Sequence, residues 1–263
     1  MLTSQEKILS HYASYQEENR ATSSRANGIE FHFTRKILND FIKKESNIIE
    51  LGCGTGHYGM HFADRCSRYT GVDLSPDNIA TFQNKILAEG KENIRAVVGN
   101  AMSVPEFSDN SFDVVLCLGP MYHLKRSDRM KVFGECKRIA KKDATLAFAY
   151  INSIGAYAGW CVNDDSRGMY PNDAANQYFL DDHVAYDNPD VFFLTSPEEM
   201  EHDAMESQLE TIQNNGLDFF FAQTAINGMS DEQFASYMAL ADAMSSSPSC
   251  TGLADHALLV CRK

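Results

Sequence analysis

A glycine-rich segment near residue 50 has the residue types and spacing of a nucleotide-binding turn. A short apolar stretch is followed by four glycines in the run Ile48-Ile49-Glu50-Leu51-Gly52-Cys53-Gly54-Thr55-Gly56-His57-Tyr58-Gly59. Glycine lets the backbone adopt positive φ and approach a ligand without a Cβ atom in the way. Where such a turn joins a parallel strand to a helix, it lies at the sheet edge that binds nucleotide-like ligands. The segment therefore predicts a ligand site directly after the first strand.

Two carboxylates accompany this turn and narrow the choice of ligand. Asp73 ends the next apolar run, where its carboxylate can accept two hydrogen bonds from a ribose diol. The spacing Gly54-x-Gly56-x-x-Gly59 with Asp73 nineteen residues after Gly54 also fits a dinucleotide fingerprint, so an NAD-dependent oxidoreductase is one alternative. Glu50 argues against that alternative, because a pyrophosphate would meet a negative charge at low dielectric. A cofactor that carries an ammonium group and a sulfonium, S-adenosyl-L-methionine (SAM), fits Glu50 better.

The elements needed to position this turn alternate between strands and helices. The apolar runs predict strands at 47–51, 68–73, 94–99, 112–118 and 144–150, with helices at 57–66, 76–89 and 127–140 between them. Ser75 before Pro76 is a typical helix start. Further helices are expected at 4–18, 28–44, from Ser196 and at 231–244, and further strands at 217–226 and 256–262. This order predicts an α/β fold, one mostly parallel sheet of about seven strands in a three-layer sandwich.

With these elements in place, the chain resembles the class I SAM-dependent methyltransferases over roughly residues 30–150. The segment from Glu50 to Gly56 is similar to the first motif of that family, and Asp73 to its second-strand acid. Gly99-Asn100-Ala101-Met102 resembles the third motif, and Ser111 to Leu124 the fourth strand with its loop. The form Leu118-Gly119-Pro120-Met121-Tyr122-His123-Leu124 is similar to a bacterial small-molecule branch. The resemblance implies a Rossmann-like sheet with a reversed last strand.

The resemblance also implies the parts of a cofactor site. It places Gly52, Cys53, Gly54 and Gly56 along the methionine moiety, Asp73 at the ribose hydroxyls, Leu74 on the adenine, Asn100 and Ala101 at the adenine edge, and Leu118 at the tip of the fourth strand. Asn100 stands where the family usually has aspartate, and its amide oxygen can still accept from the adenine amino group. The product of such a cofactor is S-adenosyl-L-homocysteine.

The loop after the fourth strand and the N-terminal segment offer the remaining site residues. In this family the loop faces the methyl group, so His123 is a candidate base and Tyr122 a positioning group; the alternative is that both only pack against the cofactor. Tyr12, Arg20 and Arg25 belong to a segment that can cover the cofactor, where Arg20 or Arg25 would pair with the SAM carboxylate. Solvated arginines at helix ends are the alternative.

Four regions follow from this interpretation. We expect an N-terminal helical lid at 1–45, a SAM-binding core at 46–150, an acceptor-covering insertion at 151–215, and the final strands with an intervening helix at 216–263. The part of the insertion up to residue 195 combines acids with aromatic side chains, at Tyr157, Trp160, Tyr170, Tyr178, Phe179, Tyr186, Phe192 and Phe193. That combination suits an amine or another cation, although a packed subdomain with an acidic surface is the alternative.

Histidines offer two further candidates, both with ordinary structural alternatives. His57 and His61 lie one helical turn apart, but the sequence shows no third ligand, so no metal is predicted. His256 precedes the last strand and either faces the acceptor or is buried and hydrogen-bonded.

Composition and charge limit the partners. The 263 residues carry a net charge of −13, and residues 151–263 hold only three Lys or Arg against eighteen Asp or Glu. A strongly acidic half repels nucleic acid and anionic membrane. The seven cysteines are scattered without a Cys-x-x-Cys pair, and neither a signal peptide nor an apolar run of transmembrane length is seen. We therefore expect a cytoplasmic monomer or homodimer that binds neither nucleic acid nor membrane.

The predicted function is methyl transfer to nitrogen or oxygen of a small molecule. An RNA or protein methyltransferase is the alternative within enzymes, and its discriminator is a steep salt dependence. A SAM-binding regulator without turnover is the alternative outside enzymes, suggested by Asn100 and by the lack of an unambiguous base.

Overall fold

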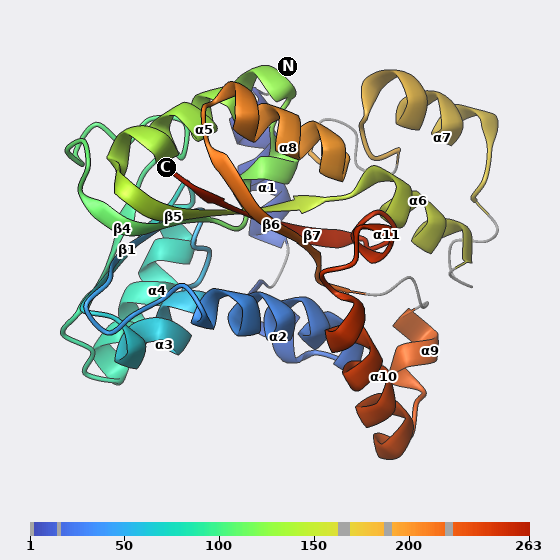
Figure 1. The fold of residues 1–263 in the computed structure, drawn as a ribbon, viewed down its shortest axis with the longest axis horizontal. Coiled ribbons are helices and arrows are strands. Elements are labelled where there is room, and N and C mark those ends of the chain that lie inside the picture. The colour runs from blue at the N-terminus through green and yellow to red at the C-terminus, as the bar shows by residue number, and fades with distance from the viewer. Residues whose placement is uncertain (1–2, 15–16, 163–168, 187–190, 219–222) are drawn as a thin grey trace.

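The computed structural model describes residues 3–14, 17–162, 169–186, 191–218 and 223–263, and its centre is a seven-stranded sheet (Figure 1). The strand order is β3-β2-β1-β4-β5-β7-β6. The strands are β1 (Asn47–Leu51), β2 (Arg68–Asp73), β3 (Ile94–Val98), β4 (Phe112–Cys117), β5 (Ala140–Ile151), β6 (Glu210–Gly216) and β7 (His256–Arg262). Strands β1 to β5 pair in parallel, whereas β7 runs antiparallel to both neighbours. The Rossmann-like sheet with a reversed last strand is confirmed.

Helices cover both faces of this sheet and complete three layers (Figure 1). Apolar side chains of α2, α3, α4 and α10 pack on one face, and those of α5 and α8 on the other. These helices are α2 (Arg25–Asn39), α3 (His57–Phe62), α4 (Pro76–Ala88), α5 (Arg126–Ile139), α8 (Pro197–Glu206) and α10 (Asp231–Met244). The other helices are α1 (Ser4–Ser14), α6 (Ser153–Val162), α7 (Asp173–Gln177), α9 (Gln223–Asn227) and α11 (Pro248–Thr251). Single turns are η1 (Glu17–Thr22), η2 (Ala63–Arg65), η3 (Pro120–His123) and η4 (Tyr178–Asp182).

Local signals predicted most of these elements well. Ser75 accepts the backbone N–H of Asn78 and so caps α4, with Pro76 at its first position. The apolar runs at 47–51 and 68–73 coincide with β1 and β2, because both strands are buried inside the sheet. None of the helices in the described ranges combines the length and apolar character that a bilayer span requires.

The predicted strand at 217–226 is wrong where the structure describes this segment; residues 219–222 lie outside the described residues, and residues 223–226 belong to α9. β6 precedes that segment, and α9 begins inside it, so the boundary expected between residues 215 and 216 falls within a strand of the core sheet. β6 pairs only with β7, and as an edge strand with a partly exposed face it needs no continuous apolar run. Leu217 and Ile226 are apolar because they pack into the core beside β7, as loop and helix residues.

Candidate active site

A cavity opens at the edge of the sheet where the parallel strands end, and most of the predicted residues line it. The cavity encloses about 1150 Å³, its open mouth included. Those predicted residues are Tyr12, Arg20, Glu50, Gly52, Cys53, Gly54, Asp73, Leu74, Asn100, Ala101, Leu118, Tyr122 and His123. They come from α1, η1, η3 and the ends of four strands, so distant segments build one cavity.

The glycine turn brings backbone close to the cavity. Gly52 and Gly54 have φ of +77° and +52°, a region that glycine enters without strain. The backbone N–H groups of Gly52 and Cys53 donate to the carbonyl of Val72 over 2.7 and 3.0 Å, which ties the turn to β2. A Cβ atom on Gly52 would lie 2.4 Å from Cδ of Pro120 in η3. Gly52 therefore sets the spacing between the first loop and the fourth.

Asp73 is held rigidly at the end of β2. Its Oδ2 accepts the Gly54 N–H at 2.8 Å, and its Oδ1 accepts the Ser75 N–H at 2.8 Å and the Asn78 amide at 3.2 Å. Burial raises the pKa of Asp73, and the hydrogen bonds from Ser75, Gly54 and Asn78 oppose that shift. Because each carboxylate oxygen accepts two hydrogen bonds, Oδ2 keeps one lone pair for a ligand.

Glu50 is a buried carboxyl beneath the turn. Its side chain accepts the hydroxyl of Tyr69 at 2.6 Å, and the residue is 1% exposed. Burial raises the pKa of Glu50 to about 8; the Tyr69 hydrogen bond opposes this, and the charge of Asp73 adds to it. Within the described residues no Lys or Arg forms a salt bridge with Glu50. A buried acid that lines a cavity without such a partner suits a cationic ligand group.

The side chain of Asn100 forms a hydrogen bond within its own loop. Its side-chain oxygen accepts the Met102 N–H at 3.0 Å, which shapes the turn after β3. Leu74, Ala101 and Leu118 contribute apolar side chains to the lining of the same cavity. This part of the cavity can take a flat, largely apolar ring with a polar edge.

His123 and Tyr12 form a hydrogen-bonded pair across the cavity. The Tyr12 hydroxyl lies 2.8 Å from Nε2 of His123, and Nδ1 lies 2.7 Å from the carbonyl of Val191. A carbonyl only accepts, so Nδ1 carries the proton and Nε2 accepts from Tyr12. Burial lowers the pKa of His123 to about 4. His123 is therefore neutral near pH 7, with both ring nitrogens engaged, and its role as a base stays a prediction.

Arg20 reaches the cavity from η1. Its Nη1 donates to Oε2 of Glu30 at 2.7 Å, and its guanidinium lies 4.5 Å from the centre of the Phe31 ring. Glu18 in the same turn pairs with Lys85, which also donates to the Thr55 carbonyl at 3.0 Å. These contacts hold the N-terminal segment over the glycine turn.

Two predicted cofactor residues lie elsewhere. Arg25 donates to the Met229 carbonyl at 2.6 Å and pairs with Asp231, so it joins α2 to the start of α10. Gly56 has φ of +84° at the start of α3, and a Cβ atom there would lie 2.0 Å from the Phe82 ring. Glycine at this position serves the packing of α3 against α4 rather than the cavity.

The sequence interpretation missed several lining residues. They are Gln5, Ile8, Leu9, Ala21, Phe31, Thr55, His57, Tyr58, Ser75, Asn78, Gly99, Met102, Gly119, Pro120 and Leu124. Some of them, such as Thr55 and Pro120, lie within or next to a recognised motif, and that motif indicates their position. The others come from α1, η1, α2 and the start of α3, and the sequence carries no local signal for how those helices dock.

His57 takes part in the cavity and not in a histidine pair. Its ring packs against Phe31 with centroids 4.3 Å apart, and burial lowers its pKa to about 4. Its Nε2 is buried and has no hydrogen-bond partner among the residues that the structure describes. His61, one turn later, is exposed.

The aromatic residues of the insertion pack mainly on one another. Tyr157 contacts Trp160, Tyr170 and Phe179 through ring edges and tilted faces. Phe192 packs on the His123 ring at 5.0 Å and so reaches the wall of the cavity. No described residue between 151 and 215 lines the cavity itself. An acceptor-covering role for this region stays a prediction.

Sequence comparisons match the central part of the chain to methyltransferases. Residues 48–143 match the family model described as a methyltransferase domain. A 101-residue stretch is 31% identical to the uncharacterized methyltransferase YcgJ of Bacillus subtilis (strain 168), covering 38% of this chain and 39% of that protein. A 139-residue stretch is 31% identical to norajmaline N-methyltransferase of Rauvolfia serpentina, covering 52% and 44%. The chain thus matches less than half the length of these curated relatives.

Solved structures extend the likeness to the whole fold. The PH0226 protein from Pyrococcus horikoshii OT3 superposes with a TM-score of 0.65 at 14% identity, covering 96% of this chain and 98% of that one. The YcgJ structure superposes with a TM-score of 0.55 at 19% identity, covering 88% and 97%. At these identities the superpositions show the fold alone.

Proposed function

We propose that the chain transfers a methyl group from SAM to nitrogen or oxygen of a small-molecule acceptor. The match of residues 48–143 to a methyltransferase domain supports this proposal. The observation that carries this proposal is that three polar residues of one cavity match three groups of SAM. Asp73 suits a ribose diol, the buried Glu50 suits an ammonium group, and Arg20 suits a carboxylate. A SAM molecule carries all three groups, whereas a dinucleotide offers no ammonium for Glu50.

The cavity passes a simple test of fit for SAM. Gly52 and Gly54 line the cavity with backbone at positive φ, so main-chain groups of the turn lie beside the space for the ligand. Leu74, Ala101 and Leu118 supply the apolar walls that an adenine ring needs. When bound, SAM supplies a methyl group activated by a positively charged sulfur.

The protein residues then have to orient the acceptor and exclude water. Tyr12 and Tyr122 line the cavity from opposite segments, the N-terminal helix and the loop after β4. We propose that Tyr122 contacts the acceptor and that His123 is a positioning residue, which fixes the Tyr12 hydroxyl through Nε2. An amine that binds uncharged needs no strong base before methyl transfer, which agrees with a neutral His123.

The acceptor class rests on charge. Residues 151–263 are strongly acidic. Their charge favours a neutral or cationic small molecule over a polyanion. Among the relatives, norajmaline N-methyltransferase is named for transfer to nitrogen. An amine acceptor is therefore the proposal.

A turnover assay over a panel of amines and phenols tests this function. S-adenosylhomocysteine production that depends on one acceptor class identifies the reaction, and calorimetry with S-adenosylhomocysteine confirms the cofactor site. Binding without turnover across a broad panel would indicate a SAM-binding regulator. Binding of NADH without a response to S-adenosylhomocysteine would overturn the proposal.

Replacing His123 by alanine is expected to lower turnover about 5-fold and to change S-adenosylhomocysteine affinity less than 2-fold. The reason is the loss of the acceptor for Tyr12, since one hydrogen bond contributes about 1 kcal/mol. His123→Gln retains an amide oxygen and should keep more of the turnover. The measurement is steady-state kinetics with calorimetry for the three proteins.

The pH dependence of turnover distinguishes a positioning role of His123 from a role as a catalytic base. With the pKa of His123 near 4, the profile should show no ionisation from this residue between pH 5.5 and 8. A step near pH 6.5 that disappears in His123→Gln would contradict the positioning role. An equal loss of turnover and cofactor affinity in His123→Ala would indicate packing alone.

A further inference from the structure

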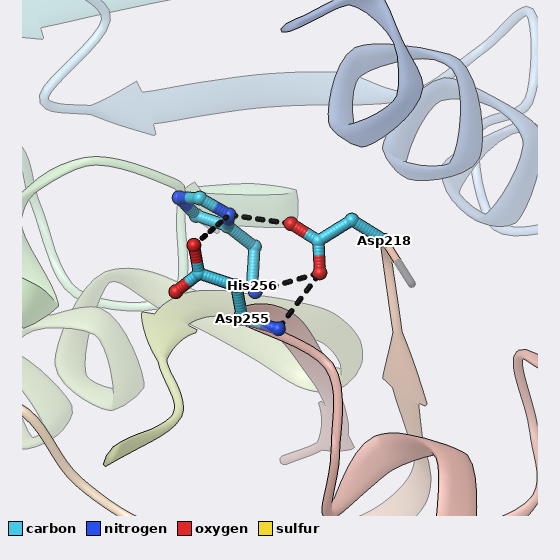
Figure 2. A group of neighbouring side chains, drawn as sticks. All are labelled: Asp218, Asp255 and His256. Atoms are coloured by element: carbon cyan, nitrogen blue, oxygen red, sulfur yellow. Dashed lines mark hydrogen bonds and ion pairs between the residues drawn. The ribbon is translucent and has the colours of Figure 1, made fainter. Parts of the chain in front are cut away.

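A row of alternating charges leads away from the cavity through Arg20. Its Nη1 donates to Oε2 of Glu30 at 2.7 Å, and the same Oε2 lies 4.0 Å from Nε2 of His256. On the other side of the ring, Nδ1 lies 2.7 Å from Oδ2 of Asp218. The row connects η1, α2, the start of β7 and the residue that follows Leu217 after β6. Figure 2 shows its outer end, with the His256 ring between the carboxylates of Asp218 and Asp255.

The outer end of this row is rigid. Oδ1 of Asp218 accepts the backbone N–H groups of Asp255 and His256 at 2.8 and 3.0 Å, and Oδ2 accepts from the His256 ring (Figure 2). Three donors therefore fix one carboxylate, and that carboxylate fixes the imidazole. The ring cannot turn away from Glu30 without losing its hydrogen bond to Asp218.

The imidazole of His256 is protonated in this setting. Burial alone would lower its pKa, but the charges of Glu30, Asp255 and Asp218 and the hydrogen bond to Asp218 raise the pKa to about 10. For Glu30, burial would raise the pKa, and Arg20 together with His256 lowers it below the ordinary value. Glu30 is thus a buried anion between two cations, and its side chain is only 10% exposed.

The charge of Glu30 determines how strongly Arg20 attracts the carboxylate of a ligand. A guanidinium that is fully neutralised by one buried carboxylate attracts a second carboxylate weakly. A second cation beside Glu30 shares that negative charge and leaves more of the positive charge of Arg20 for a ligand. The cation–π contact with Phe31 holds the guanidinium in place but adds no negative charge.

We propose that His256 is a positioning residue for cofactor binding, which shares the charge of Glu30 so that Arg20 pairs with the carboxylate of the methionine moiety. The inference rests on the proposed function, because it requires a cofactor with that carboxylate in the cavity. It assigns a binding role to a residue that does not line the cavity. It also explains why the start of β7 carries a histidine fixed from both sides.

The test compares two ligands that differ in the amino-acid part. S-adenosylhomocysteine carries the carboxylate, and 5′-methylthioadenosine has the same nucleoside without it. Replacing His256 by glutamine is expected to weaken S-adenosylhomocysteine binding about 10-fold, equivalent to about 1.4 kcal/mol. Binding of 5′-methylthioadenosine should change less than 2-fold, because it makes no contact through Arg20. Calorimetry with the full chain measures both.

A double-mutant cycle links the effect to Arg20. In an Arg20→Met background, His256→Gln should cause no further loss of S-adenosylhomocysteine affinity. His202→Gln is the matched control, since His202 also faces a carboxylate, 3.6 Å from Glu206, but lies on α8 away from the row. The control should bind both ligands as the unaltered protein does.

Failure of the proposed cofactor site and failure of the positioning role of His256 give different binding results. If the unaltered protein binds neither ligand, the proposed cofactor site itself fails. If it binds S-adenosylhomocysteine, and His256→Gln either binds it equally well or loses both ligands equally, the positioning role is overturned. A loss that persists in the Arg20→Met background would also overturn it, because His256 would then act by another route.

Discussion

Replacing Asp73 by alanine is expected to weaken SAM binding about 100-fold. In the proposed complex the remaining lone pair of Oδ2 accepts a hydrogen bond from a ribose hydroxyl, and a hydrogen bond to an ionised group contributes about 1.5 to 3 kcal/mol. A 100-fold loss corresponds to about 2.7 kcal/mol, so one such bond accounts for it. Calorimetry with S-adenosylhomocysteine measures the loss directly.

The controls for Asp73 must distinguish loss of the ribose contact from loosening of the glycine turn. The carboxylate also accepts the N–H groups of Gly54 and Ser75, so its removal loosens the glycine turn. Asp73→Asn keeps one acceptor oxygen and should lose less affinity than alanine. Asp77→Ala changes an exposed acid in the first turn of α4 and should bind normally. Unchanged affinity in Asp73→Ala, with a normal thermal unfolding midpoint, would contradict the ribose role.

Asp73 also illustrates which features the sequence could predict. The turn after β1 and the acid at the end of β2 are local: an apolar run defines each strand, and the next residues define its end. In a parallel sheet the carboxyl ends of neighbouring strands meet at one edge, so two local motifs predict a shared site. The pairing of β1 with β2 places Glu50 beside Gly71 and confirms that logic.

The residues that the sequence could not place depend on helix docking. Arg20 and Arg25 are equivalent candidates in the sequence, yet η1 carries Arg20 over the cavity while α2 carries Arg25 toward Asp231. Gly56 fits a binding motif, and only the position of the Phe82 ring shows that packing requires the glycine. The contact between Tyr12 and His123 joins residues more than one hundred positions apart. Such choices are decided by tertiary packing, which no local pattern encodes.

The affinity for SAM is expected to rise about 50-fold between pH 6 and pH 8. The pKa of Glu50 is raised to about 8 in the cavity without ligand, so the carboxyl is mostly protonated at pH 6. An ammonium group favours the ionised carboxylate, so binding at low pH must first remove that proton. The ionised fraction is about 1% at pH 6 and about half at pH 8, and the observed association constant follows this fraction. Above pH 8 the rise ends, as the cofactor's own ammonium begins to lose its proton.

Glu50→Gln tests this origin, because an amide of the same shape does not titrate. The variant should bind S-adenosylhomocysteine more weakly at pH 8 and show little change of affinity from pH 6 to pH 8. The pKa values of His57 and His123 lie near 4, so neither residue changes charge in this window. The pKa of Asp255 is raised to about 6 by its burial, but Asp255 does not line the cavity, so Glu50→Gln is expected to remove the slope. An affinity independent of pH in the unaltered protein would show that Glu50 does not meet the ammonium, and a full slope retained in Glu50→Gln would assign the proton to another group.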